Sequence, residues 1–288
     1  MISSASHLLR LSRAGYVFAR EGVLALVDTR PLPWSARTAI ALGRLIERRT
    51  ARDGSSRLAV ALTRLGPTYV KLGQFLATRP DVVGAEIAAD LANLQDKMEK
   101  FPMADAVEEI EASLGRPIDA LFTSFEEPIA AASIAQVHPA RVNRNGVEVP
   151  VAVKVIRPGV RQRVYADLES YFLAARMQER FMPSMRRLKP VEVTRGLAQT
   201  TKIEMDLRLE AAALSELGEN TKSDPGFRVP WVDWERTGRD VITMEWIDGV
   251  KMNDVEGLLA AGHDLPKLAV TLIQSFLRHT LRDGFFHA

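Results

Sequence analysis

Lys154 is the residue whose surroundings in the sequence most clearly require a chemical partner. It lies within residues 151–156, whose β-branched side chains and period of two predict a buried strand. Burying an unpaired charge is costly, so an ammonium here needs an anion such as a carboxylate or a phosphate. We therefore expect an acid from elsewhere in the chain to hold Lys154.

The candidate acids lie on a helix that we expect over about residues 193–218. One apolar stripe marks this helix, formed by Val193, Leu197, Leu207, Ala211 and Leu214. Glu204 and Glu210 border the stripe, about 120° apart at 100° per residue, so either could pair with Lys154 or remain solvated. Asp206 points nearly the opposite way and is expected on a solvated flank.

A run of small residues precedes the Lys154 strand. Small side chains allow backbone N–H groups to approach an anion closely, as glycine-rich loops do with phosphates. The same composition is typical of a tight packing corner, and both interpretations stay open. The residues concerned are Ala130, Ala131, Ala132 and Ser133.

A second polar pair, Lys71 and Gln74, lies on one face of a predicted helix within residues 66–81. Gly73 between them would allow another surface to approach closely. The alternative is a surface helix with an incidental glycine. The residues expected to face the core are Leu72, Phe75 and Leu76.

The periodicity along the chain predicts an α+β fold, in which a small antiparallel sheet packs against helices. Helical spacing covers residues 58–114, with breaks at Pro67, Pro80 and Pro102, then residues 160–220, and most of residues 252–286. A period of two covers residues 121–156, and another strand is expected over residues 241–247. Asn145-Gly146 predicts a hairpin turn.

The composition excludes several classes of site. The 288 residues, 47% apolar and 26% charged, are enough for one large or two modest globular domains. With no cysteine and five scattered histidines, neither a disulfide framework nor a metal site is predicted, and His138 is expected to be a hydrogen-bonded strand residue. The net charge of +2 gives no argument for a nucleic-acid partner, and none is expected.

No stretch of the sequence is long and apolar enough to predict a membrane span. Residues 8–20 combine Arg with Leu, Tyr and Phe at helical spacing. This segment is expected either to pack on its own domain or to lie on a membrane surface.

Together these motifs resemble the UbiB family of atypical protein-kinase-like proteins, also called the ABC1 family, whose members support ubiquinone biosynthesis. The resemblance covers residues 55–288. Lys71, Gly73 and Gln74 match the family's Lys-x-Gly-Gln signature, carried on an N-terminal extension that folds over the active site. Residues 130–133 match its alanine-rich loop, which replaces the kinase glycine-rich loop, and Lys154 matches the β3 lysine.

The resemblance also implies roles for acids and for a hinge. Glu204 and Asp206 match the family's Glu-x-Asp pair, and Glu210 resembles the αC glutamate that forms a salt bridge with the lysine. The implied cofactors are ATP and Mg²⁺. Ala135 departs from the glycine usual at its position. The hinge, whose backbone would bind adenine, resembles Met244, Glu245, Trp246 and Ile247.

The implied organisation has four parts: an amphipathic helical region over residues 1–55, a helical extension over 56–118, a kinase-like N-lobe over 119–247, and the start of a helical C-lobe over 248–288. In the family, residues 284–288 are followed by the catalytic loop Asp-x-His-Pro-Gly-Asn and the Asp-Phe-Gly metal site. We therefore expect the catalytic acid, the Mg²⁺ ligands and the family's membrane helices to lie beyond this chain, which alone would be inactive.

Two classes of function follow from the resemblance. The first is an ATP-binding ATPase or small-molecule or lipid kinase, since the extension would fill the channel that a peptide substrate needs. The second is a non-catalytic pseudokinase scaffold or lipid-binding chaperone for quinone-biosynthesis enzymes. Such proteins are sometimes labelled 2-polyprenylphenol 6-hydroxylases, although no flavin or iron site supports a monooxygenase here. Expected partners are a nucleotide, a lipid or quinone precursor, those enzymes and a membrane surface, with the parent protein cytoplasmic and peripheral to or anchored in the inner membrane.

Overall fold

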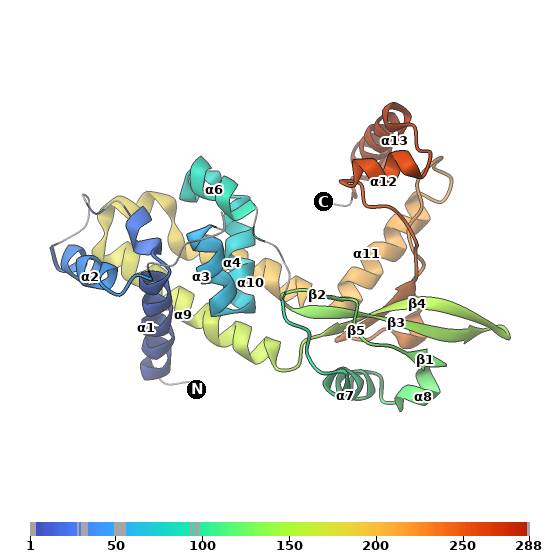
Figure 1. The fold of residues 1–288 in the computed structure, drawn as a ribbon, viewed down its shortest axis with the longest axis horizontal. Helices are drawn as coiled ribbons and strands as arrows, with labels where there is room; N and C mark the ends of the chain where they lie inside the picture. Colours follow the sequence, from blue (N-terminus) through green and yellow to red (C-terminus); the bar gives the residue numbers. More distant parts are fainter. Residues whose placement is uncertain are drawn as a thin grey trace. The chain divides into compact units, whose positions relative to one another are not determined.

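The computed structural model describes residues 4–27, 29, 34–48, 56–92, 94 and 98–286. It divides into two compact units, shown in Figure 1 with all their elements. The first unit comprises Met1–Phe101, Ala130–Gln136 and Arg157–Met205; the second comprises Pro102–Ile129, Val137–Ile156 and Asp206–Ala288. Helices and a small antiparallel sheet confirm the α+β class. The four-part division predicted from the sequence stays a prediction, and its residues 1–3, 28, 30–33, 49–55, 93, 95–97, 287 and 288 lie outside the described part.

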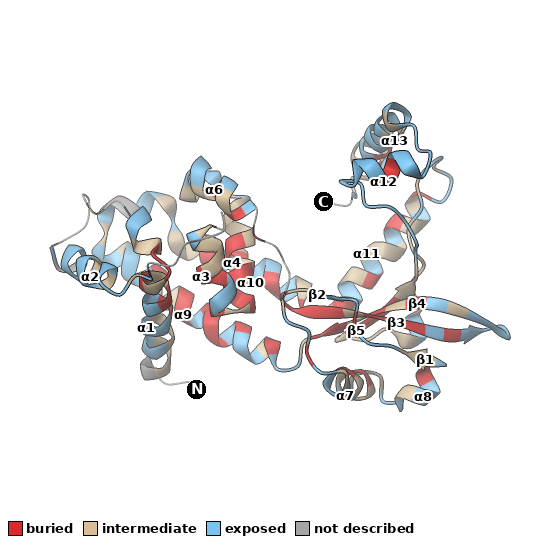
Figure 2. Cartoon of the chain, viewed as in Figure 1, coloured by how far each residue is buried: buried red, intermediate tan, exposed pale blue. Residues whose placement is uncertain are grey.

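The first unit is helical. Prolines begin four of its described helices because their fixed φ suits a first turn that needs no N–H, which confirms the breaks expected at Pro67 and Pro80. Its core includes Leu62, Val70 and Leu91. Figure 2 colours the buried residues of the chain red. Its helices are α1 (Ser4–Arg20), η1 (Val23–Leu26), α2 (Trp34–Arg44), α3 (Arg57–Leu65), α4 (Pro67–Ala77), α5 (Pro80–Val83), α6 (Ala85–Ala92), α9 (Val160–Phe181), η2 (Pro183–Leu188) and α10 (Pro190–Glu204).

Helix α1 packs on its own unit through one face. Ala14, Val17 and Ala19 are buried, and the helix contacts α3 and α9. The opposite side carries exposed Leu8, Leu9 and Tyr16. The packing alternative for residues 8–20 is thus observed for the inner face.

The antiparallel sheet, most of which belongs to the second unit, has the strand order β1-β3-β4-β5, with β2 paired to β3. Asn145 and Gly146 have φ of 56° and 83°, which confirms the predicted hairpin because a two-residue turn of this kind needs positive φ at both positions. Val151, Val153 and Val155 are fully buried, as their alternation predicts. The strands are β1 (Ser124–Phe125), β2 (Ala130–Ala131), β3 (Ala135–Arg144), β4 (Val147–Ile156) and β5 (Val241–Glu245).

Helices α7 (Met103–Leu114) and α11 (Leu207–Asn220) contact this sheet. His138 is fully buried, as expected for a strand residue with a hydrogen bond. Its Nδ1 lies 2.8 Å from the carbonyl oxygen of Glu126, and its ring stacks on Phe125. The remaining helices are α8 (Ile118–Leu121), η3 (Trp234–Arg236), α12 (Val255–Ala260), α13 (Leu265–Arg278) and the π-helical turn η4 (His279–Asp283).

The prediction of one helix over residues 193–218 is wrong. The structure has two helices, α10 ending at Glu204 and α11 beginning at Leu207. Asp206 adopts an extended φ of −123° as the N-cap of α11, and its carboxylate accepts a hydrogen bond from the N–H of Arg208. An aspartate satisfies a helix N-terminus better than it fits a helix interior, so the chain turns here. The 120° relation between Glu204 and Glu210 therefore does not exist.

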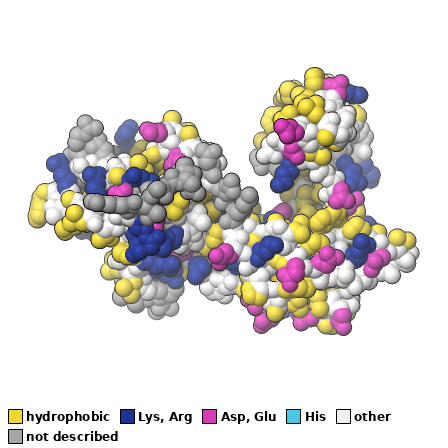
Figure 3. Space-filling model, in the orientation of Figure 1, with side chains coloured by type: hydrophobic (Ala, Val, Ile, Leu, Met, Phe, Trp, Pro, Cys, Tyr) yellow, Lys and Arg dark blue, Asp and Glu magenta, His cyan; other side chains and the backbone are white. Residues whose placement is uncertain are grey.

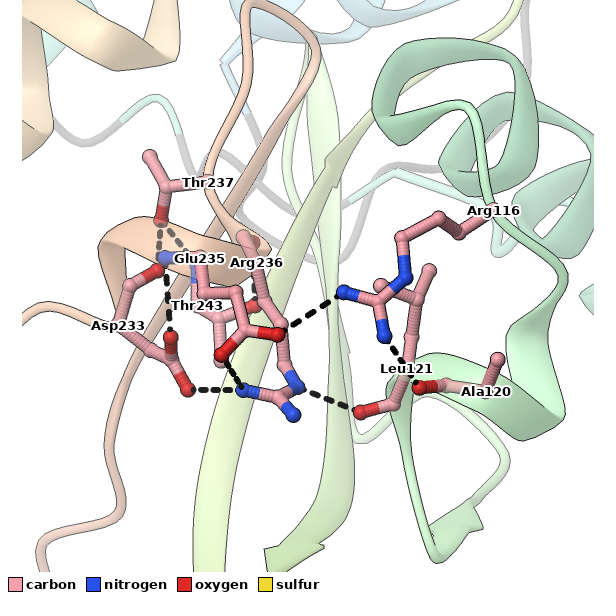
Figure 4. Close-up of polar contacts among 8 residues, drawn as sticks. All are labelled: Arg116, Ala120, Leu121, Asp233, Glu235, Arg236, Thr237 and Thr243. Atoms are coloured by element: carbon pink, nitrogen blue, oxygen red, sulfur yellow. Dashed lines mark hydrogen bonds and ion pairs between the residues drawn. The ribbon is translucent and has the colours of Figure 1, made fainter. Parts of the chain in front are cut away.

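A polar cluster fastens α8 to η3 in the second unit (Figure 4). Arg236 is largely buried; it donates to the carbonyl of Leu121 and pairs with Asp233 at 3.0 Å. Arg116 pairs with Glu235 from the other side at 2.9 Å. These contacts fix the segment that leads into β5.

Candidate functional site

The Lys154 ammonium is held by Glu210 in the second unit. Nζ lies 2.9 Å from Oε1 and 2.7 Å from Oε2 of Glu210, so one carboxylate engages it with both oxygens. The Lys154 side chain is 26% exposed, which leaves it reachable from solvent. Of the two glutamates left open by the sequence, the structure selects Glu210.

Two features of the fold set this geometry. Lys154 lies on β4 between β3 and β5 and opposite Ile242, so the backbone at its root is fixed by neighbouring strands. Glu210 lies in the first turn of α11, whose start is tied to the segment just before β5 by the N–H of Leu207, which donates to the carbonyl of Arg239. Leu207 and Ala211 are fully buried and hold the helix in place.

The pair has capacity to bind an anion. A lysine ammonium has three N–H donors, and Glu210 accepts from two of them at most by simple pairing with its two oxygens. The remaining donor is available to an oxygen of a phosphate or another carboxylate. Glu210 thus orients the Lys154 ammonium and leaves one of its N–H donors for a ligand.

The predicted hinge follows β5 in the same unit. The N–H groups of Glu245 and Trp246 donate to the carbonyls of Trp231 and Pro150, and the Trp246 indole donates to Asp248. These two backbone donors are therefore already used within the protein. Ile247, the last of the predicted hinge residues, lies beyond the end of β5 and is exposed. The strand predicted over residues 241–247 is two residues too long because β5 ends at Glu245.

The first unit contains a second lysine–glutamate pair that sequence reasoning missed. Lys71 Nζ on α4 lies 2.6 Å from Oε2 of Glu204, the last residue of α10. The Lys71 side chain is more buried than that of Lys154. The argument that a part-buried lysine needs an acid was made for Lys154 and not for Lys71. Made for Lys71 as well, it would have predicted an acid partner there.

Gly73 explains how α4 sits so close to its neighbours. A Cβ there would lie 2.7 Å from the side chains of both Leu62 and Leu94. The close approach expected at Gly73 therefore involves the core of its own unit. Gln74 is half-buried, and so are three residues predicted to face the core, because the buried side of α4 is formed by other residues. The half-buried residues are Leu72, Phe75 and Leu76; the buried ones are Pro67, Thr68, Tyr69, Val70 and Gly73.

A buried network fixes α4 just before Lys71. Asp167 on α9 accepts a hydrogen bond from Thr68 at 2.8 Å and pairs with Arg10 of α1 at 2.6 Å. Tyr69 packs edge-on against Tyr171, and burial raises the pKa of Tyr69 to about 12. The position of Lys71 is thereby tied to three helices.

The alanine run forms a tight turn in the first unit. The N–H of Ala132 donates to the carbonyl of Ala135 at 2.8 Å, and the carbonyl of Ala131 accepts from the N–H of Met98. Ala130 is exposed, Ala131 and Ala132 are half-buried, and Ser133 is fully buried. The Ser133 side chain thus packs inside the unit, as the packing-corner alternative requires, while the alanines form its accessible part.

Asp206 does not join either lysine. Besides capping α11, it pairs with the guanidinium of Arg208 at 2.7 Å. This hydrogen-bonded guanidinium holds the pKa of the Asp206 carboxyl below its usual range. Among the described residues, no group of three or more acids or histidines is placed to hold a metal ion. In the same part of the chain, no helix has the length and apolarity needed to cross a membrane.

Known proteins similar to this chain are named as kinase-like. Residues 93–288 match the ABC1 atypical kinase-like domain. Proteins named "Probable protein kinase UbiB" are 38% identical in Aeromonas hydrophila over 281 residues and 37% identical in Marinobacter nauticus over 286 residues, covering 97% and 98% of this chain. A third in Pseudomonas paraeruginosa is 39% identical over 285 residues.

The chain spans about half the length of these relatives, between 51% and 52%. A solved structure, titled "The complex structure of Rv3197-erythromycin from Mycobacterium tuberculosis", is 31% identical, with a TM-score of 0.42 over 63% of this chain and 44% of that one.

Proposed function

Because the chain belongs to the UbiB family of ABC1 atypical kinase-like proteins, we propose that it supplies the nucleotide-holding part of an ATP-binding protein that supports ubiquinone biosynthesis. The observation that carries this proposal is the Lys154–Glu210 pair, with both carboxylate oxygens within 2.9 Å of Nζ. A charged lysine with a donor to spare, rooted in a buried strand, suits a phosphate group.

The residues fit ATP in two respects. Within the second unit, Lys154 would donate to a phosphate oxygen. The segment 245–247 would contact adenine, with Ile247 as the residue whose backbone lies past the sheet. ATP would supply a phosphoryl group for transfer to water, a small molecule or a lipid.

The fit to Mg²⁺ is different. Phosphoryl transfer needs metal ions to neutralise charge between the phosphates. Glu204 and Glu210 are each engaged by a lysine, and the described residues contain no metal-binding cluster. No Mg²⁺ ligand is therefore assigned among the described residues, and no catalytic step is derived from them.

A second candidate is a non-catalytic scaffold or lipid-binding chaperone for quinone-biosynthesis enzymes. The observation that favours it is that both glutamates of the predicted site are held in ion pairs. Such carboxylates orient a ligand but are poorly suited to take a proton from a substrate. We propose the enzyme class for the longer protein and nucleotide binding for this chain.

Isothermal titration of this chain with ATP, with and without Mg²⁺, tests the proposal. Binding of ATP that exceeds binding of inorganic tripolyphosphate would support a site that recognises both base and phosphates. Equal binding of the two would restrict the site to phosphate alone. A chain that binds neither compound would overturn the proposal for this chain.

A further inference from the structure

A cavity of about 450 Å³ lies in the second unit, bordered by α11, the segment 227–230, α13 and the π-helical turn η4. This volume is within the roughly 300–1,000 Å³ that small-molecule sites occupy. We call this space the α13 cavity. Most of its walls are apolar, and they include Leu214, Leu217, Phe227, Leu272, Phe276 and Phe286.

Two polar side chains that line the α13 cavity have an atom with no hydrogen-bond partner among the described residues. Ser275 of α13 is 2% exposed, and its buried Oγ makes no hydrogen bond. His279 is 3% exposed, and its Nε2 lies 3.5 Å from Oδ2 of Asp224 without forming a hydrogen bond. A buried polar group that stays unsatisfied costs free energy. Two such groups at one cavity indicate that a bound molecule satisfies them.

The His279 ring is held in place by its neighbours. Phe227 packs edge-on against it with the two ring centroids 4.6 Å apart. Asp224, the carboxylate next to the ring, is fixed in turn by Arg282 at 2.7 Å. His279 also begins the π-helical turn η4, and π-helical turns are frequent at functional sites. The polar part of the α13 cavity is therefore formed before any ligand binds.

The walls of the α13 cavity suit a neutral ligand with a ring. The charged wall residue Arg228 already pairs with Glu245 at 3.1 Å, so its charge is compensated within the protein. Phe276 and Phe286 pack edge-on with ring centroids 5.4 Å apart, and aromatic walls of this kind favour contact with another ring. Water alone suits the cavity poorly, because each buried water needs about two to four polar partners and the apolar walls offer none.

From these features we propose that the α13 cavity binds a compact, neutral ring compound that carries an oxygen acceptor. The Ser275 hydroxyl donates to that oxygen, which satisfies the buried group, and the apolar body of the ligand covers the walls. The rim is accessible, since Leu272, Phe276 and Phe286 are 53%, 48% and 42% exposed. Figure 3 shows yellow hydrophobic side chains over the part of the unit that carries α12 and α13.

The α13 cavity is distinct from the Lys154–Glu210 pair, although both use α11. Leu214 lies about one turn after Glu210 on this helix, and Leu217 about two turns after it. Neither Lys154 nor Glu210 lines the cavity. The inference therefore does not rest on nucleotide binding, and Lys154→Ala should bind a ring compound as the wild type does.

Ligand-observed NMR titrations with 1-tetralone and tetralin test the proposal. The two probes share a bicyclic skeleton and differ in one ketone oxygen. The wild type should bind 1-tetralone roughly two- to tenfold more tightly than tetralin, because only the ketone accepts a hydrogen bond. Ser275→Ala should remove this difference and keep the affinity for tetralin.

A pair of matched variants locates the binding site. Leu272→Trp places a larger side chain at the rim of the cavity and should abolish binding of both probes. Ile273→Trp adds the same side chain at the next residue, which is 59% exposed and does not line the cavity, so both probes should bind it as they bind the wild type. Circular dichroism and the ATP titration check that each variant is folded.

Several results would overturn the proposal. A wild-type chain that binds neither probe would do so, as would unchanged binding in Leu272→Trp or equal loss in Leu272→Trp and Ile273→Trp. Equal affinity of the wild type for the two probes would remove the Ser275 contact from it. A dimer in light scattering that Leu272→Trp dissociates would assign the cavity to a second copy of the chain. Loss of binding in a chain extended to the length of its relatives would assign the cavity to the added residues.

Discussion

Replacing Lys154 by Ala tests the nucleotide site most directly. The variant removes one partner of a part-exposed ion pair, whose side chains are 26% and 38% exposed. Glu210 remains hydrated after the change, so the stability of the unbound protein should fall by about 1 kcal/mol or less. The main effect should be on ATP.

The size of that effect follows from the contact that is lost. A hydrogen bond from a charged donor contributes about 1.5–3 kcal/mol, so the Kd for ATP should rise by roughly ten- to a hundredfold. At a concentration of a hundred times the wild-type Kd, ATP stabilises the folded protein by about 2.7 kcal/mol. The same concentration should stabilise Lys154→Ala by only about 1.4 to 0.4 kcal/mol.

Thermal unfolding with and without ATP measures both quantities in one experiment. The unbound melting temperature reports the ion pair, and the increment with ATP reports binding. Lys71→Ala is the matched control because it removes the same side chain from the other lysine–glutamate pair, in the first unit. Its increment with ATP should equal that of the wild type.

An ATP increment in Lys154→Ala equal to that of the wild type would show that Lys154 does not touch the nucleotide. Glu210→Gln gives a further check, since it keeps a hydrogen-bonding oxygen near Nζ but removes the charge. Its increment should lie between those of the wild type and Lys154→Ala.

Three further predictions concern what positions the two lysines. Gly73→Ala should lower stability by about 1–3 kcal/mol, since the added methyl group enters packed space. Gly15→Ala, in open space on α1, should raise stability by up to about 1 kcal/mol. Melting temperatures of the two variants that shift in the same direction would contradict this prediction. Asp206→Ala should cost about 1 kcal/mol through loss of the α11 cap. Because the folded-state pKa of Asp206 is lowered, its contribution is complete above the ordinary aspartate pKa and is lost as pH falls through the folded value; urea titrations showing the same wild-type–variant difference across that acid range would argue against it. Arg236→Ala should cost about 1–3 kcal/mol in urea unfolding, with Arg116→Ala, on a more exposed side chain, costing less than about 1 kcal/mol; the reverse order would refute the assigned roles.

Local sequence rules predicted the elements that depend on local conformation. Asn145 and Gly146 accept positive φ, so the hairpin that carries Lys154 follows from two residues. The alternation of valines on β4 and the prolines that begin α4 and α5 were predicted for the same reason. The order of helical and strand periods along the chain predicted the α+β class, which the structure and the family comparison confirm.

Long helical patterns were predicted less well. The apolar stripe over residues 193–218 continues through Met205 and Asp206, where the backbone leaves the helix. The apolar period shows which side chains become buried, and α10 and α11 each bury the apolar side chains of the stripe that they carry. The period therefore does not show where one helix ends and the next begins. A cap formed by Asp206 competes with the helix interior, and the sequence pattern alone does not show which conformation is more stable.

The sequence by itself determined that Lys154 needs an acid, because a charge in a buried strand is unstable without one. Only the tertiary structure decided that Glu210 is this acid and that Glu204 belongs to Lys71. It also decided that Ser133 is buried and that the N–H groups of Glu245 and Trp246 are used within the protein. The physical reason is that an ion pair depends on the distance between two side chains across the fold, which packing of distant segments sets, whereas turns and strands depend on the φ and ψ preferences of neighbouring residues.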